Sequence, residues 1–316
     1  MICETATSSS VAAAVGFLAR AQQPWGEVCA RRYNNPRLIG TGLFDSSPFA
    51  TTFVLYALGA VTHPGAEPVR AAALSFLHAE LEPPGLWRYW TSRQGVAIDP
   101  DLDDTACAAF ALWGAQHGAD PPNLRIILEN RHPCGLFKTW LRHHDAHNDI
   151  DCAVNANVLL LLGEREETIP ARDRVIQTIL DGGEESACWY YPDRLALYYL
   201  ISRAFRHGVQ GFSACRDAIL RQTIRNIQDP SCTALGLAMG ICILCNFEHR
   251  SEDAVPDALE HLLAAQSADG SWPRAALYTG PEPPSSHLVW WGSEELTTAF
   301  CVEAITRSQL STKGRQ

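Results

Sequence analysis

The sequence has few basic residues. Among 316 residues, 25 Lys and Arg stand against 35 Asp and Glu, so the formal net charge is −10, and Lys and Arg form no run. Because nucleic-acid binding depends on a basic surface that neutralises phosphates, this composition excludes a nucleic-acid partner. The longest apolar run, from Ala234 to Phe247, is too short for a helix that crosses a bilayer. A transmembrane anchor is therefore excluded, whereas peripheral membrane contact stays open.

The sequence also lacks the cysteine spacings of metal-binding motifs and the basic start of a secretory signal. Its 11 cysteines include a single C-x-x-C spacing, Cys242 to Cys245, with no second such pair to complete a metal site. Several cysteines, these two included, lie inside apolar runs, where a free thiol packs as a small hydrophobe. The first 21 residues carry Glu4 and no early Lys or Arg before a short apolar stretch. We therefore expect free thiols and a cytoplasmic location.

No stretch alternates polar and apolar residues with the period of a strand, so we expect almost no β-structure. Instead, the chain repeats a unit of two helices joined by a turn. The first helix is amphipathic and bears Arg and Glu, the turn contains Gly, Pro and aromatic residues, and the second helix has few charges. The helices with few charges are predicted near 47–60, 101–116, 149–162, 191–205, 229–247 and 291–305. The amphipathic helices are predicted near 8–22, 66–82, 122–130, 168–181, 211–227 and 253–267.

This alternation predicts two concentric rings of helices. Helices that are apolar on nearly every side must be covered all round, whereas amphipathic helices can face solvent. Because each pair needs neighbours to bury its apolar face, we predict one all-α domain over residues 1–316, a single (α/α)6 double-ring toroid. The inner helices would begin at one end of the ring. Acidic residues at helix starts commonly cap free N–H groups, and this role is predicted for Asp45, Asp149 and Asp229.

One acidic segment exceeds what capping requires. Residues 99–105 read Asp-Pro-Asp-Leu-Asp-Asp-Thr and precede a nearly apolar helix. A calcium loop would need Gly and Glu where this sequence has Asp104 and Phe110, and no Gly-rich loop or basic cluster accompanies the acids to hold a magnesium diphosphate. Clustered carboxyls against an apolar wall instead favour a carboxyl that stays protonated near neutral pH and titrates with its neighbours.

Two motifs resemble one enzyme family. Asp101-Leu102-Asp103-Asp104 resembles the DxDD motif of class II terpene cyclases, the squalene–hopene cyclase superfamily, at the matching place before an inner helix. Residues 266–272, Gln-Ser-Ala-Asp-Gly-Ser-Trp, fit the QxxDGxW repeat of that superfamily, in which Gln caps a helix and stacks on Trp. Degenerate copies lie near Trp25, Trp87 and Phe137. The chain is too short for a second barrel, so it is most similar to the single-domain bacterial cyclases of meroterpenoids.

The resemblance implies a proton-initiated cyclase that needs no cofactor. Such an enzyme protonates the terminal alkene of a linear prenyl chain, here attached to an aromatic acid, forms fused rings and ends by deprotonation. It implies that Asp103 donates the proton and that Asp101 and Asp104 orient it. Aromatic faces would stabilise the carbocation by cation–π attraction, worth about 0.5–2 kcal/mol each.

The candidates for the cavity wall are mainly aromatic residues near the starts of the inner helices. They are Phe49, Trp87, Tyr89, Trp90, Trp140, Asn155, Trp189, Tyr191, Trp290 and Trp291. Each of these aromatic residues could instead pack in the core, and Trp25 and Trp272 are assigned to structure. Asn155 is preferred to Asn157 as a cavity residue.

Other functions remain open. A free prenyl diphosphate such as farnesyl diphosphate could be cyclised to a drimane-type product with Mg²⁺ as cofactor. A carbohydrate-acting or non-catalytic α/α barrel could also have this fold, the former with separated carboxylates in a wet groove. The β-subunit of protein prenyltransferases shares the fold and binds zinc, but Asp151-Cys152 has the wrong spacing for it, so no metal is expected. One of the histidines His143, His144 and His147 could contact the acids.

Overall fold

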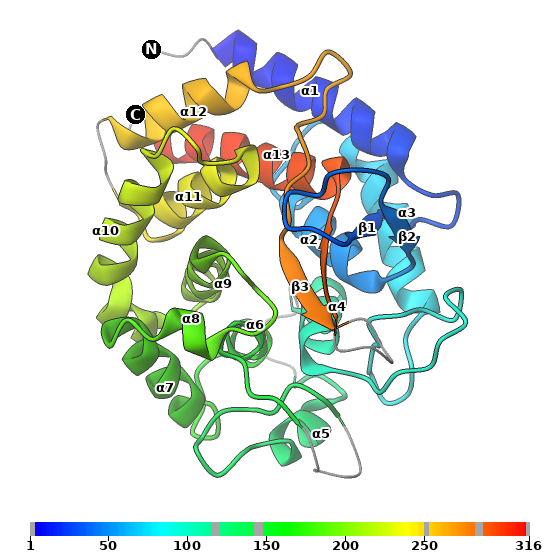
Figure 1. Cartoon of the computed structure of the whole chain (residues 1–316), viewed down its shortest axis with the longest axis vertical. Helices are drawn as coiled ribbons and strands as arrows, with labels where there is room; N and C mark the ends of the chain where they lie inside the picture. The colour runs from blue at the N-terminus through cyan, green and yellow to red at the C-terminus, as the bar shows by residue number, and fades with distance from the viewer. Residues whose placement is uncertain (1–3, 115–119, 142–147, 250–252, 282–286, 314–316) are drawn as a thin grey trace.

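The computed structural model describes residues 4–114, 120–141, 148–249, 253–281 and 287–313. Within this part of the chain an inner ring of helices closes on itself, because each helix contacts the next and the last contacts the first (Figure 1). Its members are α2 (Pro48–Leu58), α4 (Leu102–Trp113), α6 (Cys152–Leu162), α9 (Arg194–Arg206), α11 (Ala234–Asn246) and α13 (Glu294–Lys313).

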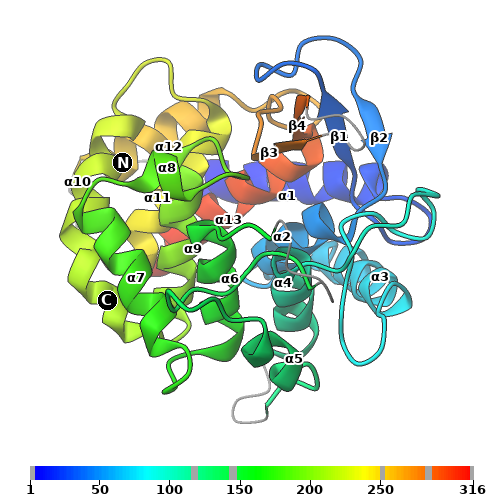
Figure 2. The same ribbon diagram turned by 60° about the horizontal axis from the view of Figure 1, so that its bottom comes forward.

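An outer set of helices surrounds this ring. These helices are α1 (Glu4–Ala21), α3 (Ala66–Ala79), α5 (Leu124–Glu129), α7 (Ile169–Leu180), α10 (Arg216–Ile227) and α12 (Ala254–Ala264). A short helix α8 (Glu184–Ala187) and a 3-10 helix η1 (Gln210–Cys215) lie in the connections. Outer and inner helices alternate along the chain, so the predicted all-α double-ring toroid is confirmed (Figures 1 and 2).

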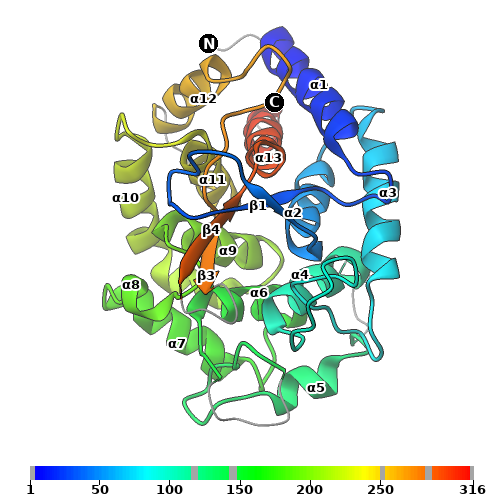
Figure 3. The ribbon, with the colours of Figure 1, turned by 45° about the vertical axis from the view of Figure 1, so that its right-hand side comes forward.

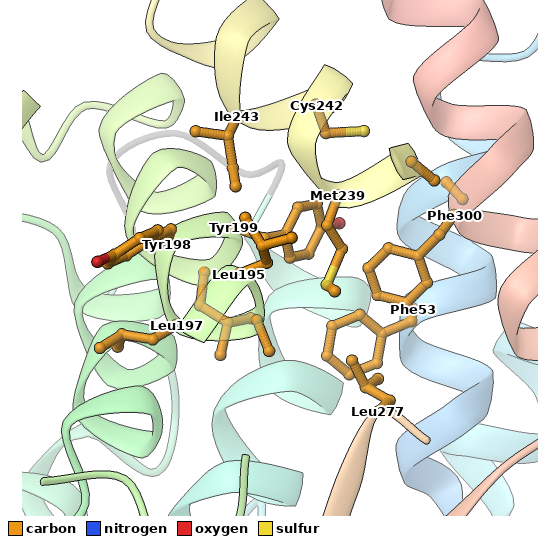
Figure 4. Packing of buried hydrophobic residues seen from close by; sticks show 14 of the residues in the cluster. Phe53, Leu195, Leu197, Tyr198, Tyr199, Met239, Cys242, Ile243, Leu277 and Phe300 are labelled. Atoms are coloured by element: carbon orange, nitrogen blue, oxygen red, sulfur yellow. The ribbon is translucent and has the colours of Figure 1, made fainter. Parts of the chain in front are cut away.

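The burial of each set follows from its residue pattern. In α6 every residue except Leu161 is buried, as expected for a helix that is apolar on all sides. In α7 only every fourth residue is buried, namely Ala171, Val175 and Ile179, so the rest of that helix faces solvent. Large side chains fill the centre of the ring. Phe53 of α2 and Tyr199 of α9 pack on Phe300 of α13, with ring centroids 5.4 and 4.9 Å apart (Figure 4).

Little β-structure is present in the described residues, as expected, but the small sheet that the structure contains was not predicted. Four short strands form an antiparallel sheet in the order β2-β1-β4-β3: β1 (Ala30–Tyr33), β2 (Leu43–Asp45), β3 (Tyr278–Pro281) and β4 (Leu288–Gly292). The strands are three to five residues long. Alternation is hard to detect over so few residues, and β1 pairs with a strand from the other end of the chain. Strands β3 and β4 lie in front of the opening of the helical ring (Figure 3).

The predicted capping roles of Asp45, Asp149 and Asp229 were also wrong. The inner helices begin three to five residues later, and Ser47, Asp151 and Thr233 are the N-caps of α2, α6 and α11. The Asp45 carboxylate lies against the sheet, Asp149 accepts a hydrogen bond from a tyrosine hydroxyl, and Asp229 bonds within its own exposed turn. In each of these three segments, the residue that caps the helix therefore lies later in the chain than the acid predicted to do so.

Residues of the QxxDGxW repeat tie neighbouring helix pairs together. The Gln266 amide donates to the carbonyl oxygens of Ser10 in α1 and Gly270, both at 3.0 Å. Gln22, in the degenerate copy, makes the same two kinds of bond to Val69 in α3 and to its own turn. The glycine of the repeat has a φ of 94°, and a Cβ there would overlap the carbonyl oxygen of Ala13. Only glycine fits this turn.

Two further expectations concern the chain as a whole. Ten cysteines from Cys29 to Cys301 lie in the described residues, and all of them are free thiols, as the sequence predicts. Over the same residues, no helix combines the length and apolarity needed to pass through a membrane.

Candidate active site

A cavity lies where α2, α4 and α6 begin and where β3 and β4 cover the ring. Its volume is about 120 Å³. Three carboxyls, those of Asp101, Asp103 and Asp104, face it. The rest of its wall is mostly apolar and aromatic: Phe49, Tyr89, Trp90, Ile98, Thr139, Trp140, Val154, Tyr190, Tyr278, Thr279, Gly280, Pro281 and Trp291.

The start of α4 positions the acids. Asp101 is the N-cap, and its Oδ1 accepts a hydrogen bond from the backbone N–H of Asp104 at 2.8 Å. The N–H of Leu102 donates to the carbonyl oxygen of Thr139 at 2.7 Å, which fixes the helix start to the neighbouring loop. Asp103 and Asp104 thus occupy the first turn of α4. A helix start is the end at which the dipole favours negative charge.

Asp103 is held by two side-chain donors. The Tyr191 hydroxyl donates to Oδ2 and the Asn157 amide donates to Oδ1, each at 2.6 Å. Asp103 is partly accessible, whereas Asp101 and Asp104 are only 4% and 3% exposed. Burial raises the pKa of Asp103 to about 6, although the bonds from Tyr191 and Asn157 lower it. A carboxyl with this pKa is protonated in a minor fraction of molecules at pH 7, and that fraction grows as the pH falls through 6.

Asp101 and Asp104 form a second, interacting pair of carboxyls. Burial raises the pKa of Asp101 to about 7, and the negative charge of Asp103 adds to this effect. Burial and the charges of Asp101 and Asp103 raise the pKa of Asp104 well above its usual value. Neighbouring carboxylates in an apolar site disfavour one another's ionisation, so the cluster retains protons at neutral pH.

A buried arginine sets the orientation of Asn157. The Arg203 guanidinium donates to Oδ1 of Asn157 at 2.9 Å and is itself only 2% exposed. It stacks on Phe53 and Tyr56, 5.1 and 4.8 Å from the ring centroids. Because a guanidinium only donates hydrogen bonds, the amide oxygen of Asn157 must face it and the NH₂ group must face Asp103. The donor to Asp103 is thereby fixed.

The register of β3 and β4 builds the opposite wall. Tyr278 and Trp291 are directly paired across the two strands, and their rings stack with centroids 5.5 Å apart and planes at 14°. Phe49 meets Tyr278 edge-on at 5.1 Å, and the hydroxyls of Tyr89 and Tyr278 are 3.1 Å apart. Stacked and edge-on pairs of this kind are favourable arrangements of aromatic rings. They leave an aromatic surface opposite the three acids.

The structure brings many of the sequence candidates to this cavity. Asp101, Asp103, Asp104, Phe49, Tyr89, Trp90, Trp140 and Trp291 lie in its wall. Tyr191 reaches the site through its hydrogen bond to Asp103.

Four sequence candidates lie elsewhere. Trp87 is fully buried in the core, where its indole N–H donates to the carbonyl oxygen of Leu77 at 2.9 Å. This bond repeats the one from Trp272 to Leu262, so Trp87 is a repeat residue like the tryptophan of the QxxDGxW motif. Trp189 is 68% exposed.

The local structure keeps the other two candidates, Trp290 and Asn155, out of the cavity wall. Trp290 precedes Trp291 on a strand, and since successive side chains alternate between the faces of a sheet, only Trp291 faces the cavity. Asn155 bonds the backbone N–H and carbonyl oxygen of Phe137 at 2.7 and 2.9 Å. Thr105 and Thr298 receive the backbone N–H of Trp87 and Trp272 in the same way, so Asn155 belongs to the repeat.

Sequence reasoning missed several residues of the site. Asn157 contacts Asp103, although Asn155 was preferred, and the two differ by only two positions on a buried helix. The apolar character of α6 gives no sign of which face meets α4. Tyr278 was missed because β3 was not predicted. The available signal was an aromatic residue followed by a β-branched residue, Tyr278-Thr279, a combination that favours a strand.

The residues considered for metal binding have other roles. Both carboxylate oxygens of Asp151 accept backbone N–H bonds, Oδ1 from Ala153 and Oδ2 from Trp189 at 2.7 and 2.6 Å. The Cys152 thiol lies 3.7 Å from the Thr178 hydroxyl. Among the described residues, no three His, Cys, Asp or Glu side chains are grouped to hold a metal ion. His143, His144 and His147 lie outside those residues.

Comparisons with known proteins identify structures that have the same fold. A scan against protein-family models gave no match, and a search of curated proteins gave none either. Solved structures do match. A protein from Actinoplanes has a TM-score of 0.70 at 17% identity, with 96% of this chain and 99% of that chain covered.

Type II terpene cyclase MstE from Scytonema, without ligand, has a TM-score of 0.72 at 17% identity, covering 97% of this chain and 99% of MstE. A substituted MstE in complex with geranylgeranyl dihydroxybenzoate, its substrate, has the same TM-score and identity and covers 97% and 98%. The chain therefore has the fold of a type II terpene cyclase.

Proposed function

We propose that this protein is a class II terpene cyclase that uses Asp103 as its general acid. The observation that carries the proposal is the setting of Asp103: a carboxyl with a raised pKa faces an aromatic cavity and has two hydrogen-bond donors behind it. A carboxyl that is to protonate carbon must be neutral before the reaction and stabilised as an anion after it. Burial supplies the first condition, and Tyr191 and Asn157 supply the second.

The reaction balances without a co-reactant. The O–H bond of Asp103 breaks and a C–H bond forms at the terminal alkene of a linear prenyl chain. The tertiary carbocation is attacked by the next alkene, each ring closure forms one C–C bond, and loss of a proton from carbon ends the cascade. The product is an isomer of the substrate. The aromatic wall stabilises the cation and excludes water, which would otherwise capture it.

The substrate class follows from the cavity and from the structural neighbour. Three acids face the cavity, so an anionic head group is repelled from this end and the apolar end of the chain enters. The volume of about 120 Å³ is near that of a cavity of about 150 Å³ that holds benzene, so it suits the end where the first ring closes. Because MstE binds geranylgeranyl dihydroxybenzoate, we propose a linear prenyl chain attached to an aromatic acid, converted without a metal or cofactor.

The test is product analysis in deuterium oxide. Purified protein, treated with a chelator, is given a panel of geranyl, farnesyl and geranylgeranyl hydroxybenzoates and the corresponding free diphosphates. We expect a cyclised product of unchanged elemental composition that carries one deuterium on carbon, and no product from the Asp103→Asn variant. The matched control is Asp257→Asn, which removes an exposed carboxyl of α12 and should leave turnover unchanged.

Three other outcomes would contradict the proposal. An active Asp103→Asn variant would refute the proposed role of Asp103. Turnover of free diphosphates with a complete dependence on Mg²⁺ would show the diphosphate reaction instead. Tight binding of oligosaccharides, without turnover of any prenyl compound, would indicate a carbohydrate-acting barrel.

A further inference from the structure

The Asp45 carboxylate is fully buried but has no part in the protonation step. It is the last residue of β2 and is 0% exposed. Its Oδ2 accepts the indole N–H of Trp291 at 2.8 Å and lies 3.6 Å from Nε of Arg32, while its Oδ1 accepts from the Gln94 amide at 3.1 Å. All these partners donate, which is the pattern that an ionised carboxylate requires.

The sheet brings these groups together from the two ends of the chain. Arg32 on β1 is paired with Trp291 on β4, and β1 also pairs with β2, which ends at Asp45. The negative charge of Asp45 therefore lies directly behind the cavity wall.

Trp291 joins this charge to the cavity. Its indole is 5% exposed and forms part of the cavity wall, stacked on Tyr278 and in edge contact with Tyr89 at 5.5 Å. When an indole N–H donates to an anion, electron density shifts into the ring. The face of the ring then becomes more negative and attracts a cation more strongly, since cation–π attraction is electrostatic.

We propose that Asp45 is a positioning residue that acts through Trp291: its carboxylate orients the indole and makes it a stronger π-donor to a carbocation in the cavity. This rests on the proposed cyclase function. The cost of burying this carboxylate is offset by its three donors, Trp291, Gln94 and Arg32. Arg32 is a partial counter-charge that moderates the effect.

Binding of a cationic probe tests the inference without turnover. The probes are octyltrimethylammonium and the neutral 1-nonanol, measured by titration calorimetry with the full chain. For Asp45→Asn, which keeps the side-chain shape and one acceptor oxygen, we expect ammonium binding to weaken about three- to tenfold, in line with the size of cation–π effects. Binding of 1-nonanol should stay within about twofold of wild type, because a neutral ligand gains nothing from the ring charge.

A matched control exists in the same region. The Trp25 indole N–H donates to the buried carboxylate of Glu27 at 2.7 Å, but Trp25 is not part of the cavity wall. Glu27→Gln therefore removes a carboxylate behind a tryptophan outside this cavity wall, and probe binding should not change. Arg32→Gln removes the counter-charge and should strengthen ammonium binding, which tests the inference even if Asp45→Asn fails to fold.

A double variant tests whether Asp45 influences ammonium binding through Trp291. In a Trp291→Phe background, Asp45→Asn should have no further effect on ammonium binding. An equal loss in both backgrounds would show that Asp45 acts directly through space and would overturn the inference, as would unchanged ammonium binding in Asp45→Asn and Arg32→Gln.

Turnover separates this inference from the proposed function. If the function is correct, Asp45→Asn should lower kcat at an unchanged KM and increase partially cyclised products. A wild-type protein that forms no deuterated cyclic product contradicts the proposed function, whatever the probes show. An active wild type with an identical kcat and product ratio in Asp45→Asn contradicts only the role of Asp45.

Discussion

Replacing Asp103 by Asn should make the protein more stable at pH 8 while it abolishes cyclisation. Asn has the same shape, and it can still meet the Tyr191 hydroxyl and the Asn157 amide that flank Asp103. What the substitution removes is the free-energy cost of ionising a buried carboxyl. The prediction therefore links the proposed acid to a measurable change in the free energy of unfolding.

The magnitude follows from the pKa of Asp103. Burial raises it from 3.8 to about 6, and a shift of about two units corresponds to about 3 kcal/mol. Because the folded protein binds this proton more tightly than the unfolded chain, the proton stabilises the fold at low pH, and this contribution is lost as the pH rises through 6. Between pH 5 and pH 8 the free energy of unfolding of the wild type should fall by about 1 kcal/mol, and that of Asp103→Asn should not show this fall. The remainder of the ~3 kcal/mol is lost below pH 5.

Urea unfolding at pH 5 and pH 8 measures this difference. The stability of Asp103→Asn relative to wild type should increase by about 1 kcal/mol between the two pH values, with equal m-values showing that the unfolding transition itself is unchanged. The Asp257→Asn control removes an exposed carboxyl and should follow the wild type. Parallel pH dependences for wild type and Asp103→Asn would refute the reasoning, since the Asp103 carboxyl would then be solvated rather than buried.

Three further predictions concern the acid, the repeat and the surface. The cyclisation rate should rise as the pH falls through about 6, and Tyr191→Phe should move this midpoint upward and lower kcat, because the hydrogen bond that lowers the pKa of Asp103 is lost; a pH–rate profile measures both. Gly270→Ala should lower the free energy of unfolding by at least about 2 kcal/mol more than Gly40→Ala, since both have a positive φ but only Gly270 lies against backbone; urea unfolding compares them. Trp189→Ala should leave turnover and melting temperature unchanged, because that side chain is largely exposed; a changed kcat would contradict its placement.

The helical architecture could be predicted because it depends on local patterns. A helix such as α6 must be covered on all sides, whereas α7 must keep one side in solvent, and both requirements are visible in the order of apolar and polar residues. Alternation of such helices allows few arrangements other than two rings. The acid cluster was equally visible, because four carboxyls before an apolar helix are more than capping needs.

Contacts between distant segments could not be predicted in this way. Asn155 and Asn157 are similar residues on one helix, and their different partners, Phe137 and Asp103, depend on how α6 packs against α4. Trp87 and Trp90 both follow α3, but a turn directs one into the core and the other to the cavity.

The sequence by itself determined the helices, their order in two rings and the acids at the start of α4, because these depend on residue periodicity and on neighbours in the chain. Only the tertiary structure decided which donors meet Asp103 and which charge lies behind Trp291. Asp45 and Trp291 are joined by a sheet that pairs strands from opposite ends of the chain. Such pairing leaves little local signal, since what stabilises each short strand is its distant partner.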